Sequence, residues 1–95
     1  MFVYADNAAT TRIAPQVLDA MLPYLKEEYG NPSTLYKLGR EAKIAIEKAR
    51  EQVAQVIGAK AEEIFFTGSG TEADNMALKG VLYGPAGKGK KHLIT

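Results

Sequence analysis

The 95-residue sequence contains no cysteine, which excludes disulfides, thiolate metal sites and a cysteine nucleophile within this stretch. An excess of charge of one sign is also lacking, and a net charge of +1 gives no electrostatic reason to expect nucleic acid, a membrane surface or an acidic partner. No apolar run approaches the roughly 18 residues that span a bilayer. The N-terminus lacks the basic start and apolar core of a signal peptide. A cytoplasmic protein is therefore expected.

The length is sufficient for one domain and too short for two. Hydrophobic residues make up 46% of the chain and charged residues 24%, which is ordinary globular composition. A chain of this size buries only about 60–65% of the surface that its unfolded form exposes. Its independent stability should therefore be modest.

The first third is expected to carry a short apolar run, a loop and one helix. Residues 2–5 indicate a strand or an extended arm, and the small polar residues 6–11 indicate a loop. A helix is predicted from about Pro15, because the fixed φ of proline suits the first helical position. Pro23 should loosen this helix by clashing with the preceding turn. Gly30-Asn31-Pro32 should end it.

The second helix has the clearest pattern. Its apolar residues recur at intervals of three, four and one, as one buried helical face requires; they are Leu35, Leu38, Ala42, Ala45, Ile46, Ala49, Val53, Val56 and Ile57. The opposite face is charged and should be solvated, with Lys43 and Glu47 forming an i,i+4 pair. Gly58 is placed to terminate the helix at its C′ position.

A strand, a helix and a second strand are predicted for the last third. Residues 64–67 form a continuous apolar run, typical of a strand buried on both faces. A helix over about 71–83 should follow, then a flexible basic loop at 84–91 and a buried strand at 92–95. This βαβ pattern predicts an α/β fold with a parallel sheet. The residues expected to face inward on the helix are Ala73, Met76, Ala77, Gly80 and Val81.

The turn between the first strand and this helix carries the main indication of chemistry. Glycines on both sides of Ser69 allow a sharp turn, and Glu72 three residues later matches a capping box that would start the helix. Free amide groups in a first helical turn, aided by the helix dipole, form an anion site. Thr71 would add a hydroxyl donor for a phosphate oxygen. The turn by itself is also compatible with a plain capped βα turn that binds no ligand.

Other candidate sites carry less weight. The segment 84–90 fits half of a nucleotide P-loop, but Lys91 replaces the Ser or Thr that holds magnesium, and the segment precedes a strand. The Rossmann fingerprint is absent around Gly68. His92 is the only histidine, and a metal site there would need partners that the sequence does not supply.

Three motifs in register resemble the NifS/IscS-like cysteine desulfurases, members of the class V aminotransferase group that use pyridoxal phosphate (PLP). They are YADNAATT at 4–11, GNPS at 30–33 and FTGSGTEADN at 66–75. The resemblance implies a PLP-dependent transferase of the aspartate aminotransferase-like fold type I. Only the N-terminal helices and the first strands of the large-domain parallel sheet would be present. Residues 1–14 would join the small domain, and residues 15–95 would begin the PLP-binding large domain.

The resemblance also implies where the cofactor lies. The backbone of Gly70 and Thr71, together with the Thr71 hydroxyl, would hold the 5′-phosphate of PLP, and residues 6–11 would lie near the mouth of the active site. It implies no catalytic residue and no metal ligand in this stretch. The family's ring-stacking histidine follows the strand at 92–95, so His92 is not that residue. The Schiff-base lysine, the aspartate facing the pyridine nitrogen and the persulfide cysteine come later still.

The implied activity converts L-cysteine to L-alanine and leaves a persulfide for iron–sulfur cluster or cofactor assembly. The intact enzyme would be a homodimer that works with a sulfur-acceptor or scaffold protein, and this chain alone is predicted to be inactive. The sequence departs from the family at Tyr36, where many relatives carry histidine, and at Gly68-Ser69, where Ser-Gly is usual. Two alternatives remain open: a selenocysteine lyase or other class V relative, and a stand-alone phosphate-binding or interaction module without chemistry.

Overall fold

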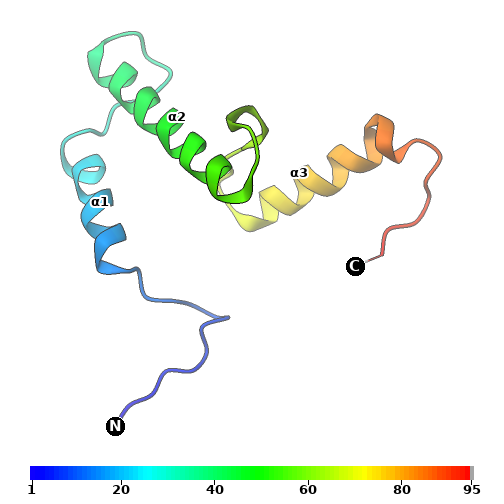
Figure 1. The fold of residues 1–95 in the computed structure, drawn as a ribbon, viewed down its shortest axis with the longest axis horizontal. Coiled ribbons are helices and arrows are strands. Elements are labelled where there is room, and N and C mark those ends of the chain that lie inside the picture. The colour runs from blue at the N-terminus through cyan, green and yellow to red at the C-terminus, as the bar shows by residue number, and fades with distance from the viewer. Residues whose placement is uncertain (95) are drawn as a thin grey trace.

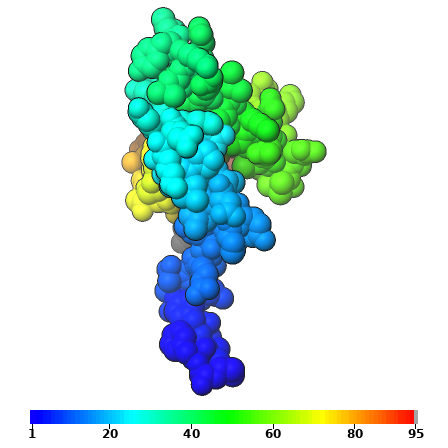
Figure 2. Space-filling view, turned by 90° about the vertical axis from the view of Figure 1, so that its left-hand side faces the viewer, coloured from blue at the N-terminus to red at the C-terminus, as the bar shows by residue number. Residues whose placement is uncertain are grey.

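The computed structural model describes residues 1–94, which form three α-helices and two short 3-10 helices. The helices are α1 (Pro15–Lys26), α2 (Lys37–Ile57) and α3 (Gly70–Tyr83), and the 3-10 turns are η1 (Ala61–Glu63) and η2 (Pro85–Gly87). Figure 1 shows α1 and α2 joined by a loop, with α3 beyond the C-terminal end of α2. Residues 1–14 form an extended arm that projects from the helices (Figure 2).

Helix α1 begins at Pro15, as predicted, but ends earlier than its expected stop. Pro23 lies inside the helix, and its carbonyl accepts the amides of both Glu27 and Glu28 at 2.9 Å. These bonds close the helix at Lys26, four residues before Gly30. The proline ring weakens the last turn, so the helix stops soon after Pro23.

Helix α2 confirms its predicted C-terminus. Gly58 adopts the left-handed conformation at φ 69°, and its amide bonds the carbonyl of Gln55 at 3.4 Å. The next amide, of Ala59, bonds the carbonyl of Ala54 at 2.9 Å. Together these two bonds form a Schellman motif, which a glycine at C′ makes without steric cost.

The charged face of α2 is exposed, as expected, but its ion pairs differ from the prediction. Glu47 pairs with Arg50, with Oε2 3.2 Å from Nε, instead of with Lys43. Lys37 and Glu41 form an i,i+4 pair at 3.6 Å near the start of the helix. The long side chain of Glu47 can reach either neighbour, and the less exposed Arg50 is the partner it takes.

The predicted strands do not form: residues 1–94 contain no strand. Residues 64–67 and 92–94 have no regular secondary structure, and no partner strand for them lies within the described part of the chain. Phe65 and Phe66 are 65% and 53% exposed, so the expected burial on both faces is wrong for this chain. A strand is defined by hydrogen bonds to a neighbour, and an apolar run cannot supply that neighbour itself. Thr95, the last residue of the second predicted strand, lies outside the described residues.

The basic loop predicted at 84–91 contains η2, a tight turn in which the Gly87 amide bonds the carbonyl of Gly84 at 3.1 Å. Pro85 opens this turn, consistent with its fixed φ. The segment is therefore partly ordered by its own backbone bonds. It follows α3 directly and packs against it.

Little apolar surface is buried in this arrangement. The only buried hydrophobic residues in the described chain are Ala42 and Ala54. The accessible surface is 8694 Å², against about 5,400 Å² for a compact monomer of this mass. The radius of gyration is 18.1 Å, where a compact domain of this length would have about 12 Å. The apolar face of each helix therefore remains without a covering layer.

Candidate functional site

The turn at the start of α3 is organised by three local hydrogen bonds. The hydroxyl of Ser69, the N-cap residue, accepts the amide of Glu72 at 3.2 Å. The Glu72 carboxylate accepts the amide of Gly68 at 2.8 Å, and the Thr67 hydroxyl donates to the Ser69 carbonyl at 3.0 Å. Only half of the predicted capping box is formed: Ser69 caps the amide of Glu72, whereas Glu72 bonds the amide of Gly68 instead of the N-cap amide.

Within residues 1–94, these bonds leave three consecutive amides without a protein acceptor, those of Ser69, Gly70 and Thr71, and the last two belong to the first turn of the helix. Within residues 1–94, the amides of Gly70 and Thr71 donate no hydrogen bond to protein, because the intrahelical pattern starts with Ala73 bonding Ser69. Both residues are exposed, and a Cβ built on Gly70 would meet nothing within 4 Å. An anion can therefore approach both amides from solvent. The helix dipole favours such an approach.

The turn supplies only part of what a phosphate group requires. Three amides and the Thr71 hydroxyl offer four donors, whereas the three terminal oxygens of a phosphate monoester accept more bonds than that. The Glu72 carboxylate also places a negative charge in the first turn, although its Oε2 is engaged by Gly68. The arrangement is suited to contribute to an anion site whose remaining donors come from other elements.

The other sequence motifs form their own local structures. Residues 6–11 make a turn in which Asp6 Oδ1 accepts the amide of Ala9 at 3.3 Å. Asn31 makes an Asx turn by accepting the amide of Ser33 at 2.9 Å. In the described chain, no hydrogen bond joins either motif to the turn at 67–72. His92 lies beside Lys90 and Lys91, and no cluster of three metal-binding side chains occurs among the residues described.

Sequence reasoning did not single out Arg50, which the structure brings close to this turn. Its Nη1 donates to the carbonyl of Ile64, and its guanidinium lies 5.2 Å from the centre of the Phe66 ring. Arginine on a charged helix face is usually solvated, so its type alone gave no indication. Its place directly after Ala49, at the edge of the apolar stripe, is the sequence signal that could have identified it.

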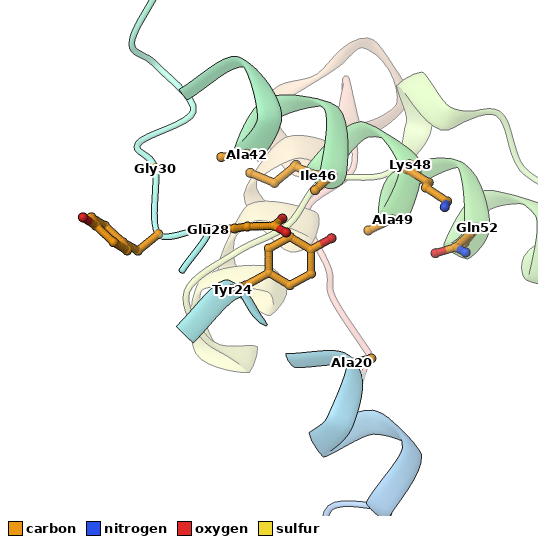
Figure 3. Close-up of a pocket in the computed structure, with 11 residues that line it drawn as sticks. Ala20, Tyr24, Glu28, Gly30, Ala42, Ile46, Lys48, Ala49 and Gln52 are labelled. Atoms are coloured by element: carbon orange, nitrogen blue, oxygen red, sulfur yellow. The ribbon is translucent and has the colours of Figure 1, made fainter. Parts of the chain in front are cut away.

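An open groove of about 770 Å³ lies between α1 and α2, away from the glycine turn. Figure 3 shows Tyr24 and Glu28 directed toward Ile46 on α2. Tyrosine, alanine and isoleucine side chains dominate its lining. No cluster of chemically reactive groups converges there. The groove is an uncovered apolar surface and not a candidate for chemistry.

The family profile described as aminotransferase class-V matches residues 3–95. The chain belongs to the class-V aminotransferase family. The match runs from the arm through all three helices, so the turn at 67–72 lies within the family's common sequence. Among residues 1–94 of this class-V chain, no helix has the length and hydropathy of a bilayer-crossing segment.

Curated class-V relatives named cysteine desulfurase match almost the full chain. The chain is 55% identical over 93 residues to "Cysteine desulfurase IscS" of Dictyoglomus turgidum, covering 98% of this chain and 23% of that relative. It is 50% identical, with the same coverage, to "Cysteine desulfurase IscS" of Methanosarcina thermophila. The chain therefore spans about a quarter of the length of the curated relatives it matches.

A solved structure titled "NIFS-LIKE PROTEIN" has a TM-score of 0.82 to this chain at 48% identity, over 87% of this chain and 23% of the other. The helices thus have the arrangement that the matching part of that larger class-V protein has. This places the chain in PLP-dependent fold type I, as the sequence predicted. The sheet detail of that prediction is not borne out, since residues 1–94 contain no strand.

Proposed function

We propose that this chain is the first part of a PLP-dependent cysteine desulfurase, which converts L-cysteine to L-alanine and keeps the sulfur as an enzyme-bound persulfide. Similarity to relatives named cysteine desulfurase, at 46–55% identity across nearly the whole chain, supports the proposal. The whole protein would act as a cytoplasmic homodimer and pass sulfur to an acceptor or scaffold protein. These partners follow from the proposed activity.

The observation that carries the cofactor assignment is the pair of free amides at Gly70 and Thr71. They stand at the positive end of a 14-residue helix, with open space in front of Gly70. We infer that these amides and the Thr71 hydroxyl bind the 5′-phosphate of PLP. Bound PLP supplies an electron sink for the bonds around the substrate's α-carbon.

The arm at residues 1–14 would join the small domain of the intact enzyme, and residues 15–95 would begin the large domain. All of the arm is exposed and extends away from the helices, which leaves it available for a second layer of structure (Figure 1). Removing residues 1–14 should therefore leave the helices intact while weakening the junction between domains.

The sharpest test deletes one amide donor and leaves the helix in place. Proline is favoured at the first helical position, and Ser69 before it is already extended at φ −164° and ψ 161°, as a residue preceding proline must be. Gly70→Pro therefore removes the Gly70 amide with little strain. Gly70→Ala is the matched control, because it keeps the amide and its Cβ meets open space.

The variants are best made in a chimera in which this chain replaces the matched 93 residues of the Dictyoglomus turgidum relative. Gly70→Pro should weaken PLP binding by about ten- to a hundredfold, the loss of one hydrogen bond to a charged group, about 1.5–3 kcal/mol. Gly70→Ala should change it by less than about twofold. Affinity for pyridoxal, which lacks the phosphate, should be unchanged in both. Unaltered PLP affinity in Gly70→Pro would refute the assignment.

A further inference from the structure

Arg50 connects α2 to the segment that leads into the glycine turn. Its side chain is only 22% exposed, and its Nη1 donates to the Ile64 carbonyl, 14 residues away. Among residues 1–94, every other side-chain hydrogen bond spans four positions or fewer. Arg50 therefore makes the one side-chain hydrogen bond that fixes segments distant in the sequence.

Three contacts hold the guanidinium group in place. Glu47 accepts from Nε at 3.2 Å, which orients the planar group along α2. The carbonyl of Ile64 accepts from Nη1, and the Phe66 ring lies 5.2 Å below the guanidinium carbon. A planar group with several donors can bond two acceptors and stack on a ring at once. A lysine ammonium at this position could replace part of this set but not all of it.

The contacts bear directly on the turn, because Phe66 is followed at once by Thr67, where the turn begins. Residues 64–67 belong to no helix or strand in this chain, so backbone pairing does not fix their position. η1 packs on α2 just before them, and Ile64 ends it with a bond from its amide to the Ala61 carbonyl at 3.1 Å. Arg50 then holds the carbonyl group of Ile64, so that both the amide and the carbonyl of this residue are hydrogen-bonded.

We propose that Arg50 is a positioning residue for the phosphate-binding turn: by holding the Ile64 carbonyl and the Phe66 ring, it sets where the Gly70 and Thr71 amides point. This rests on the proposed function of that turn. Arg50 acts through residues 64–67 and does not touch the ligand itself. Its removal should therefore impair recognition of the phosphate group while leaving recognition of the rest of the cofactor unchanged.

The test uses the same chimera with Arg50→Met, Arg50→Lys and, as matched control, Arg40→Met, an exposed arginine on the same helix outside these contacts. Dissociation constants for PLP and for pyridoxal are measured by cofactor fluorescence, with the phosphorus NMR shift of bound PLP as a second readout. Arg50→Met should weaken PLP binding about tenfold and leave pyridoxal binding within about twofold. Arg50→Lys should weaken PLP binding by a smaller factor and also leave pyridoxal binding unchanged. Arg40→Met should change neither dissociation constant.

The outcomes separate this inference from the proposed function. Equal weakening of PLP and pyridoxal by Arg50→Met, or no change in either, overturns the positioning role. If Gly70→Pro also leaves the preference for PLP over pyridoxal intact, the phosphate assignment itself is wrong. If the Arg50→Met chimera does not fold, the Arg50→Lys chimera is used instead. An unchanged affinity of the Arg50→Lys chimera for PLP would contradict the proposal.

A second measurement needs no chimera. Hydrogen exchange read by mass spectrometry on the 95-residue chain should show faster deuterium uptake over residues 64–73 in Arg50→Met than in Arg40→Met. Equal uptake in the two variants would mean that Arg50 does not restrain the turn.

Discussion

The carboxylate of Glu72 accepts the amide of Gly68 at 2.8 Å and so closes the turn in front of α3. This bond occupies the amide that precedes the N-cap residue, while Ser69 occupies the amide of Glu72 itself. Within residues 1–94, the amides of the turn that are left without a protein acceptor are those of Ser69, Gly70 and Thr71. The same side chains that start the helix thus select which of its amides a ligand can reach.

Replacing Glu72 should loosen this turn without removing the ligand's donors. We expect Glu72→Ala to destabilise the start of α3 by about 1 kcal/mol, the usual effect of a lost cap. Glu72→Gln keeps an acceptor and should lose less than half of that. Hydrogen exchange of the Gly68 amide is the direct measurement, since the bond to Glu72 protects it. Equal exchange in wild type and Glu72→Ala would show that the bond does not persist in solution.

The uncovered helix faces should make the isolated chain self-associate. Large apolar side chains such as Leu35, Val56 and Tyr83 are 85–89% exposed, and within residues 1–94 the only buried hydrophobic residues are two alanines. Exposed apolar surface on this scale favours association and binding of hydrophobic dyes. Light scattering during a thermal melt should show oligomers or aggregates and a broad transition. A monodisperse monomer with one sharp transition would favour a stand-alone module instead.

Alone, the 95-residue chain should release no sulfide from L-cysteine above the rate with free PLP. It contains no cysteine to carry a persulfide, and its candidate cofactor site consists of the donors of one turn. The assay compares sulfide release by the chain plus PLP with PLP alone, and the chimera is the positive control. Turnover by the chain well above free PLP would contradict the predicted inactivity of this segment.

Two glycine substitutions should move helix stability in opposite directions. Gly58→Ala places a Cβ in the left-handed conformation at φ 69°, which should cost about 1 kcal/mol at the end of α2. Gly80→Ala, inside α3 with open space around it, should stabilise its helix by about 0.5–1 kcal/mol. Circular dichroism at 222 nm over a thermal melt measures both. Gain of helix in Gly58→Ala would show that the Schellman motif is not formed.

The ends of several helices were predicted correctly from sequence patterns a few residues long. Pro15, Gly58 and Ser69 mark helix ends that the structure confirms, because each end depends on a dihedral preference or a cap a few residues away. The stripe on α2 has the predicted period, yet only Ala42 and Ala54 of that helix's hydrophobic residues are buried. Of the predicted stripe only Ala42 is buried, and Ala54 lies outside that stripe, so the burial of this face stays a prediction because residues 1–94 do not supply a covering layer.

Contacts between segments that are distant in the sequence could not be predicted from sequence patterns. The pairing of Glu47 with Arg50 instead of Lys43 depends on where residues 64–66 lie, since Arg50 is drawn toward Ile64 and Phe66. The unpaired state of 64–67 depends on the absence of a neighbouring strand in the described chain. Both are decided by groups far away in the sequence, which a periodicity cannot report.

By itself, the sequence determined the helix positions, the glycine turn before α3 and the likeness to class-V enzymes, because capping, period and motif spacing are local properties of the chain. Only the tertiary structure decided which amides of the turn remain free, which charged residue anchors it, and that the apolar faces stay uncovered. Free donors and uncovered faces are defined by what lies next to them in space. That depends on how the segments are placed relative to one another.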